Sequence, residues 1–415
     1  MVPSFVLAVV LSFSAILVFT HALWLAIDGR RRRLPPGPWT LPVIGSVHAV
    51  LACSELAGRT VMDTMRAEGH AGNCVMFLPP GPKWRAIRKL VMAEVMARSQ
   101  LAAREELRQE KAREELPVDV GHAAFVTAVD LVSRTLLSID VGSREMRDKV
   151  KEGSHLLATP TIADIFPCLG AADLQGARRR LSALLRYAYG IVDEEIERRR
   201  RGRDAGEPRK NDMVDLPDMN YDLIRDLITD LFLAGSETVS STVEWAMAEL
   251  LQCPKSMEMV KEELKAVIGT KGQVAESDIS QLRYLQAVRA MATVEIEGYI
   301  IPKGTSIIIN IWSLSRKSKM WVEPEKFMPE RFIGNDISYW GKDFELIPFS
   351  AGRRQCLGLP LAHRMLHLIL GSLLYHFDWM LPTDVKDNGI DMSEKPGGIV
   401  SMATPLKAIA KKCDQ

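Results

Sequence analysis

The stretch from Pro348 to Gly358, PFSAGRRQCLG, decides how the rest of this sequence is interpreted. Its cysteine, Cys356, lies between Gly352 and Gly358, and glycine allows backbone turns that other residues resist. Two arginines precede the cysteine, and an apolar stretch with helical spacing, Leu361 to His376, follows it. The arginines and the N-terminus of that helix would stabilise a negative charge on the sulfur. The stretch therefore predicts a loop that can hold a thiolate close to a flat cofactor.

Three shorter motifs lie elsewhere in the chain. They are Trp84-x-x-x-Arg88, the AGSET run at 234–238, and the PERF run at 329–332. Each is weak alone, since the first spacing also suits an amphipathic surface helix and Thr238 could simply hydrogen-bond back to its own helix. They gain weight from their order along the chain relative to Cys356.

The pattern Phe349-x-x-Gly352-x-Arg354-x-Cys356-x-Gly358 resembles the haem-binding signature of the cytochrome P-450 monooxygenases. Several fixed positions make that signature highly specific. The three shorter motifs resemble other motifs of this family in order and spacing. The run LGLPLA at 357–362 is most similar to plant microsomal members of the geraniol-hydroxylase-like group. The resemblance covers nearly the whole chain, with internal gaps.

The resemblance implies a haem-thiolate site. Cys356 would be the axial ligand of the iron of haem (heme b). Thr238 would hold dioxygen and a water in the central helix, and Glu237 would relay protons from solvent. The implied cofactor-binding residues are Cys356, Arg354, Phe349, Gly352, Gly358, Trp84, Arg88 and Arg289, of which the arginines and Trp84 would contact the haem propionates.

The resemblance also implies partners. The chain has no glycine-rich dinucleotide fingerprint, so electrons would come from a membrane-bound NADPH-dependent reductase. Its docking face would include Lys83, Arg85 and Lys89, which could equally be ordinary surface charge. The other implied partners are O2 and a small lipophilic substrate, for which a terpenoid, hydroxylated in plant secondary metabolism, is the expectation.

The composition limits the alternatives. With 415 residues, 47% hydrophobic and 25% charged, the chain has the balance of a folded globular protein with a large core. The net charge of +1 gives no global attraction to nucleic acid. Six cysteines are too few for a disulfide scaffold.

The N-terminus predicts a membrane anchor. Phe5 to Ile27 contains no charged residue, four arginines follow at 30–33, and prolines follow at 35, 36 and 38. The apolar run is long enough to cross a bilayer, and the arginines would stay on the cytosolic side. A cleaved signal peptide is the alternative. We expect an anchor at 1–28, a basic and proline-rich hinge at 29–40, and a monooxygenase domain at 41–415, single-pass in the endoplasmic reticulum membrane with the catalytic body in the cytosol.

The body is expected to be mainly α with a small β-sheet. Helical spacing of apolar residues covers 83–107, 125–137, 177–200, 221–251 and 256–267, and the clearest strand signal is Thr293 to Ile309. The basic run Arg198 to Lys210 predicts a solvated helix end followed by a loop, and a contact with anionic lipid has no support.

The chain also departs from the family it resembles. Members carry a Glu-x-x-Arg pair on a helix before the strand segment, and the carboxylate of this pair bonds to the arginine of the PERF run. Here Tyr284–Val288 leads directly into Arg289, Gln286 lacks the needed charge, and Arg331 is left without its carboxylate partner. Smaller contractions lie between Arg59 and Trp84 and between Asp212 and Tyr221.

Two hypotheses therefore stand. The first is a membrane-anchored haem-thiolate monooxygenase with its chemistry intact. The second is a truncated, catalytically inactive relative that is anchored in the membrane and binds haem poorly or not at all.

Overall fold

The computed structural model describes residues 61–79, 81–96, 119–210, 212–215, 220–287, 321–335, 337–341, 343, 346–350, 355–395, 397 and 399–413. The predicted anchor and hinge lie outside the described residues, as does the predicted strand segment 293–309. Three of the predicted cofactor-binding residues, Gly352, Arg354 and Arg289, lie outside them too.

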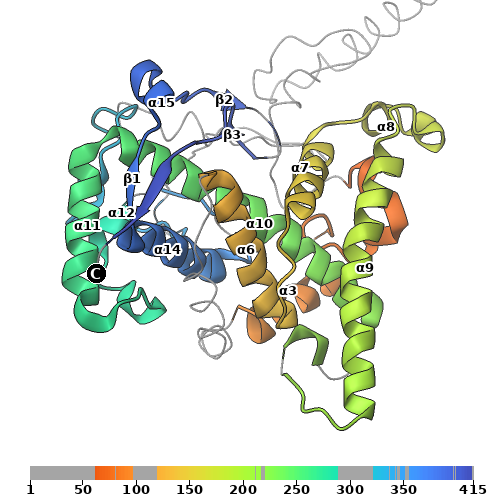
Figure 1. Ribbon diagram of the computed structural model, residues 1–415. Coiled ribbons are helices and arrows are strands. Elements are labelled where there is room, and N and C mark those ends of the chain that lie inside the picture. Colours follow the sequence, from red (N-terminus) through yellow and green to blue (C-terminus); the bar gives the residue numbers. More distant parts are fainter. Residues whose placement is uncertain are drawn as a thin grey trace, which may run out of the picture.

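The described part is mainly helical with small sheets, as predicted (Figure 1). Its longer helices are α3 (Pro82–Glu94), α6 (Val120–Leu137), α7 (Arg144–Ala158), α9 (Ala177–Asp204), α10 (Tyr221–Gln252), α11 (Pro254–Ile268) and α14 (Leu359–His376). Shorter helices and turns are η1 (Asp63–Gly72), α8 (Ile162–Ile165), η2 (Pro167–Ala172), η3 (Met213–Asp215), η4 (Gly269–Lys271), η5 (Glu276–Asp278), α12 (Arg283–Ala287), η6 (Pro329–Phe332) and α15 (Thr383–Asn388).

Helix α10 is the axis of the fold. It passes between α9 and α11 and also packs against α6, α7 and α14 (Figure 1). The side chain of Asn220 accepts a hydrogen bond from the backbone N–H of Asp222 at 2.8 Å and caps its start. It ends before Pro254, which cannot continue a helix. Gly235 allows the close approach of α6, because a Cβ there would lie 3.1 Å from Cγ2 of Val132.

Two small antiparallel sheets lie near the C-terminus. Strand β1 (Phe377–Met380) pairs with β4 (Ile409–Lys412), and β2 (Glu394–Lys395) pairs with β3 (Ser401–Met402). Trp379 and Met380 of β1 lie opposite Ala410 and Ile409. The second sheet packs on α10, where Val400, just before β3, accepts a hydrogen bond from Ser241 at 3.1 Å.

Within the described ranges, one helix is long and apolar enough to cross a membrane by length and composition. This helix is α6, and 83% of its apolar window is buried inside the protein. Its side chains form the core against α10, including Leu131, Val132 and Leu136. The finding does not bear on the predicted anchor at 1–28.

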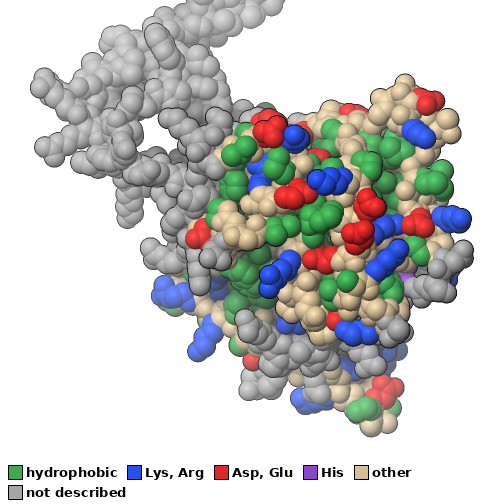
Figure 2. Space-filling model, turned by 90° about the vertical axis from the view of Figure 1, so that its left-hand side faces the viewer, with side chains coloured by type: hydrophobic (Ala, Val, Ile, Leu, Met, Phe, Trp, Pro, Cys, Tyr) green, Lys and Arg blue, Asp and Glu red, His purple; other side chains and the backbone are tan. Residues whose placement is uncertain are grey.

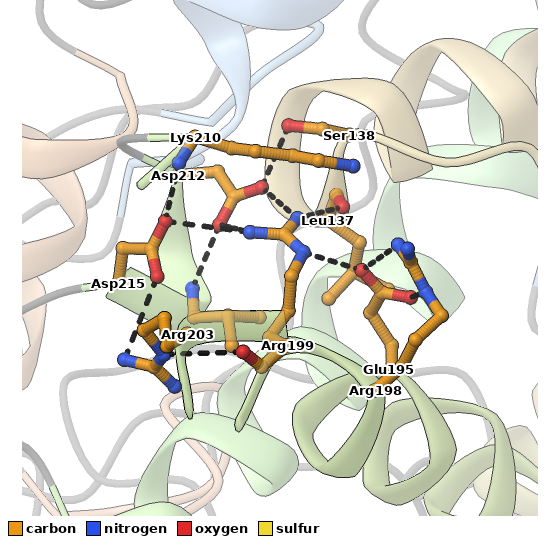
Figure 3. A network of polar contacts seen from close by, with 10 residues as sticks. Leu137, Ser138, Glu195, Arg198, Arg199, Arg203, Lys210, Asp212 and Asp215 are labelled. Atoms are coloured by element: carbon orange, nitrogen blue, oxygen red, sulfur yellow. Dashed lines mark hydrogen bonds and ion pairs between the residues drawn. The ribbon is translucent and has the colours of Figure 1, made fainter. Parts of the chain in front are cut away.

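The basic run at the end of α9 is less solvated than predicted. A helix end at Asp204 and a loop after it are confirmed, but Arg199 is only 6% exposed. Its guanidinium donates to Glu195 at 2.6 Å and to Asp212 at 2.6 Å, and it lies 3.3 Å from Asp215 (Figure 3). It also donates to the carbonyl oxygen of Leu137 at the end of α6. The network ties α9 and η3 to α6, at the position of the third contraction.

Basic and acidic side chains are mixed on the face of the molecule that Figure 2 shows. Basic and acidic side chains alternate there, with apolar side chains between them. This mixture agrees with the near-equal totals of 53 basic and 52 acidic residues.

Candidate functional site

The cysteine loop closes on itself immediately before α14. The backbone N–H of Cys356 donates to the carbonyl oxygen of Phe349 at 3.0 Å, and Ser350 adopts a left-handed φ of 60° between them. Gly358 is the N-cap of α14, so Cys356 lies two residues before the N-cap. The Cys356 side chain is exposed. The loop thus presents a thiol to solvent at a helix N-terminus, where the helix dipole favours its anionic form.

Helix α3 is joined to this loop through Arg88. The Nη2 group of Arg88 donates to the carbonyl oxygen of Gln355 at 2.8 Å, and its guanidinium lies 5.5 Å from the ring centre of Trp84. Burial lowers the pKa of Arg88, while the charge of Cys356 opposes that shift. The structure therefore brings Arg88 to the residue that precedes Cys356.

The Trp84 side chain is buried and bonds to the segment that precedes α3. It is 5% exposed, and its Nε1–H donates to the carbonyl oxygen of Val75 at 3.1 Å. Trp84 therefore orients α3 against the segment before it. Phe349, the first residue of the motif, is half-buried, with its ring 6.5 Å from that of Tyr339.

A stripe of small side chains is exposed in the middle of the otherwise buried helix α10. Its members are Ala234, Thr238 and Thr242, spaced four residues apart. Thr238 donates to the carbonyl oxygen of Ala234 at 2.7 Å, and Thr242 donates to that of Thr238 at 2.7 Å. The back-bond considered for Thr238 from the sequence is therefore present.

The stripe leads into a hollow between α10 and α14. The hollow is open to solvent and has a volume of about 20 Å³, room for roughly one water molecule. Its lining is mostly apolar and consists of Val243, Ala246, Leu285, Leu366 and Leu370, together with the polar Thr242 and His367. The hollow is thus a small apolar depression that borders the exposed stripe at Thr242.

The Glu237 side chain is directed toward α7, whereas Thr238 is exposed. It is 8% exposed and lies against α7, where Ser154 hydrogen-bonds to it and Lys151 and Arg147 supply positive charge. Burial raises the pKa of Glu237, and these three groups oppose the shift. Among the described residues its Oε2 atom has no hydrogen-bond partner. The structure therefore does not place the side chains of Glu237 and Thr238 on the same face of α10.

Arg331 takes carbonyl partners in the place of the missing carboxylate. Its guanidinium donates to the carbonyl oxygens of Val322 at 2.9 Å, Glu323 at 3.0 Å, Lys326 at 2.7 Å and Met328 at 3.2 Å. These four bonds offset the cost of its partial burial. Arg331 thus holds a loop rather than an ion-pair network.

The residues around the predicted missing helix are bonded elsewhere. Gln286, the formal substitute for the absent glutamate, donates to the carbonyl oxygen of Ile279 at 2.5 Å. The Tyr284 hydroxyl donates to Glu330 at 2.7 Å. Helix α12 is therefore joined to the PERF run through Glu330 and not through Arg331.

Sequence reasoning missed a buried polar cluster beneath α9. His70 Nε2 lies 2.9 Å from Oδ1 of Asp230, and Cys74 Sγ donates to the same oxygen at 3.0 Å. On the other side of the ring, His70 Nδ1 lies 2.8 Å from the Tyr189 hydroxyl and 3.2 Å from Asp226. The spacings His70-x-x-x-Cys74 and Asp226-x-x-x-Asp230 are the signal, but nothing in the sequence shows that they meet.

The protonation of this cluster follows from its contacts. Burial lowers the pKa of His70, but hydrogen bonds with Asp226 and Asp230 outweigh it and raise the pKa to about 9. Burial, reinforced by the charge of Asp230, raises the pKa of the Cys74 thiol. Both residues therefore carry their protons at neutral pH.

Known proteins match this chain over most of its length. The family model described as cytochrome P450 matches residues 45–288 and 289–410. The break between the two matched stretches falls at the junction where the sequence lacks a helix.

Individual relatives agree with the family match. Cytochrome P450 76C2 of Arabidopsis thaliana is 35% identical over 91% of this chain and 92% of its own length. Ferruginol synthase of Isodon rubescens is 34% identical over 95% and 98%, and geranylhydroquinone 3''-hydroxylase of Arnebia euchroma is 31% identical over 93% and 96%. The first alignment runs over 469 positions, more than the 415 residues of this chain, so it contains positions that this chain lacks.

Proposed function

Because this chain belongs to the cytochrome P450 family, with plant relatives over most of its length, we propose that it hydroxylates a small, lipophilic, terpenoid-like substrate. Members are monooxygenases that use haem held by an axial cysteine thiolate. The names of the Isodon and Arnebia relatives, a ferruginol synthase and a geranylhydroquinone hydroxylase, support the substrate class.

Cys356 is the proposed axial ligand. The single observation that carries this assignment is an exposed thiol two residues before the N-cap of α14, in the family's motif. The exposed stripe of small side chains on α10, bordered by apolar side chains of α14, supports a flat, apolar group over this face of α10. When bound, haem supplies the activation of dioxygen, and the thiolate ligand favours cleavage of the O–O bond.

The other residues act through position and protons. Arg88 holds the Cys356 loop through Gln355 and offers its guanidinium to a propionate. The Thr238 hydroxyl proton is engaged with Ala234, so its oxygen faces solvent as an acceptor and can hold a water. Glu237 relays protons from solvent toward the haem site, and it does so from the side of α10 that faces α7, where Lys151 and Arg147 lie. Arg354, Gly352, Gly358, Phe349 and Arg289 complete the proposed cofactor-binding set.

We extend the proposal to the setting of the enzyme. Residues 1–28 anchor the chain in the endoplasmic reticulum membrane, 29–40 form a hinge, and 41–415 form the cytosolic catalytic domain. The apolar run and the four arginines support this arrangement. An NADPH-dependent reductase supplies the electrons.

Product analysis with labelled oxygen tests the function. The full chain, co-expressed with a plant NADPH-dependent reductase, is incubated with monoterpenols and diterpene phenols under ¹⁸O2. We expect one ¹⁸O atom per product molecule, with none formed by Cys356→Ala. A protein that contains haem but converts no member of either terpenoid class would contradict the proposed substrate.

The inactive relative is the second candidate. The observation that favours it is the break in the family match at residue 288, together with an Arg331 that bonds to four carbonyls. This candidate predicts a folded, membrane-bound chain with little or no haem after expression with excess haem precursor.

A further inference from the structure

We propose that His70, Cys74 and Asp230 form a Zn²⁺ site that fastens residues 63–79 to α10. One ligand atom from each residue lies within 4.8 Å of the other two. All three side chains are buried, with His70 3%, Cys74 0% and Asp230 2% exposed. The site is separate from Cys356 and its proposed haem, and uses none of the residues assigned to that chemistry.

The ligand set suits zinc. Imidazole nitrogen, thiolate sulfur and carboxylate oxygen are its three common protein ligands, at about 2.0 to 2.3 Å in tetrahedral geometry. Such ligands lie roughly 3.3 to 3.6 Å from one another. The present separations of 2.9 Å from His70 to Asp230 and 3.0 Å from Cys74 to Asp230 would therefore open by about half an ångström. The fourth position is left to a water.

The surroundings of His70 resemble the outer shell of a metal site. A ligating histidine usually donates its second ring N–H to a carboxylate, which fixes the ring and raises its basicity. Here Asp226 lies 3.2 Å from Nδ1, on the side opposite Asp230. Asp226 is itself held by the Tyr189 hydroxyl at 2.7 Å and by Asn73 at 2.6 Å.

The charges balance when the ion binds. Without the ion, Asp230 accepts one hydrogen bond from Nε2–H of His70 and one from the thiol of Cys74. Zn²⁺ displaces both protons to solvent and forms bonds to the nitrogen, the sulfur and the carboxylate. The second oxygen of Asp230 keeps its hydrogen bond from the backbone N–H of Val75 at 2.9 Å. The Cys74 thiolate and the Asp230 carboxylate together neutralise the two charges of Zn²⁺, which lowers the cost of burying the ion.

The position of the proposed zinc site indicates a stabilising role for the segment that precedes α3. Residues 63–79 stand where the chain is contracted before Trp84, and Val75 is the hydrogen-bond partner of Trp84. A metal that joins Cys74 to Asp230 would fix Val75 against α10. Through Trp84 it would fix α3, which carries Arg88. The ion would then replace stability lost with the contracted segment.

Metal content and cobalt absorption test the site in the purified full chain. We expect about one zinc per chain, and, after removal of zinc and addition of Co²⁺, a thiolate-to-cobalt charge-transfer band that saturates at one ion. Proton release should accompany ion binding, because the Cys74 thiol must ionise, and it is measured by calorimetry in buffers of different ionisation enthalpy. A folded chain with no zinc and no cobalt band would overturn the proposal.

Matched variants locate the ion. Cys74→Ser, which keeps a hydroxyl donor toward Asp230, should lose the band, while Cys356→Ala and the exposed Cys168→Ser should keep it. Asp226→Asn should keep the band but bind Co²⁺ about 10- to 100-fold more weakly. A band that survives Cys74→Ser, or one that disappears with Cys356→Ala, contradicts the assignment. If Cys74→Ser does not fold, the affinity of Asp226→Asn for Co²⁺ tests the site instead. An affinity equal to that of the parent protein would contradict the proposed site.

Discussion

Arg88 donates a hydrogen bond from Nη2 to the carbonyl oxygen of Gln355 at 2.8 Å, although 267 positions separate the two residues. The bond joins the Trp84-x-x-x-Arg88 motif to the residue before Cys356. Two motifs that are each defined by sequence therefore meet in one place. The protein retains this contact even though the helix expected after Val288 is missing from the chain.

We expect Arg88→Ala to weaken both the loop and its cofactor. The half-buried charge-assisted hydrogen bond should contribute about 1 to 2 kcal/mol, discounted for partial exposure. The free energy of unfolding in urea should fall by that amount, and haem should be lost faster to an excess of apomyoglobin. Lys89→Ala, an exposed cation on the next residue, is the control. Equal behaviour of the two variants would contradict the role of Arg88.

Arg199→Ala should be the most destabilising removal of an arginine charge from α9. It leaves Glu195, Asp212 and Asp215 without their shared cation (Figure 3). Removal of one partner of a buried ion-pair network costs about 3 to 5 kcal/mol. Arg200→Ala, at a side chain 64% exposed, should change stability by less than about 0.5 kcal/mol. Denaturant midpoints that differ little between the two variants would show that the network carries no stability.

Glu237 should impose a pH dependence on stability. Its pKa is raised in the folded state by burial, so the folded protein binds a proton more tightly than the unfolded chain does. Stability then falls as pH rises from about 4.3, the unfolded value, through the raised pKa, and stays reduced above it. Glu237→Gln removes this loss. The stability of the variant relative to the parent should rise across that window and then level off, whereas a constant difference would refute the assigned shift.

Thr238→Ala should lower the amount of product formed for each NADPH that the enzyme consumes. Loss of the hydroxyl removes the proposed water-holding oxygen, so product per NADPH consumed should fall at least several-fold. Stability should change by less than about 0.5 kcal/mol, because the lost bond lies on an exposed helix face. Thr242→Ala removes the same kind of back-bond one turn further on and is the control. If both variants couple electrons to product equally, Thr238 has no special role.

The sequence predicted the helices well where apolar spacing was strong. Helix α10 runs from Tyr221 to Gln252, against an expectation of 221–251, and α11 and α14 end within two residues of their predicted limits. Helix α7 was not predicted, because its sequence REMRDKVKEGSHLLA is largely charged and polar, and tertiary contacts with α9 and α10 support it. Its cap, Ser143 bonded to the N–H of Met146 at 3.1 Å, was a usable signal.

The sequence pointed to individual residues of the candidate site but not to their hydrogen-bond partners. The motif identified Cys356 and Arg88 as members of one site, yet the bond to Gln355 is set by tertiary packing. Likewise the missing carboxylate of Arg331 could be deduced, but its carbonyl partners depend on a loop conformation that no pattern encodes. The burial of Arg199 inside a run of arginines was missed, because charge runs are usually solvated and only the contact with α6 reverses this.

The central claim is that Cys356 holds haem through its thiolate in this shortened chain. The measurement that tests it most directly is the carbon-monoxide difference spectrum of the reduced, purified protein after expression with haem precursor. We expect the red-shifted Soret band of a thiolate-ligated haem, abolished in Cys356→Ala and retained in Cys168→Ala. Absence of haem, or a band of the non-thiolate type in the parent protein, would contradict the account and favour the inactive relative.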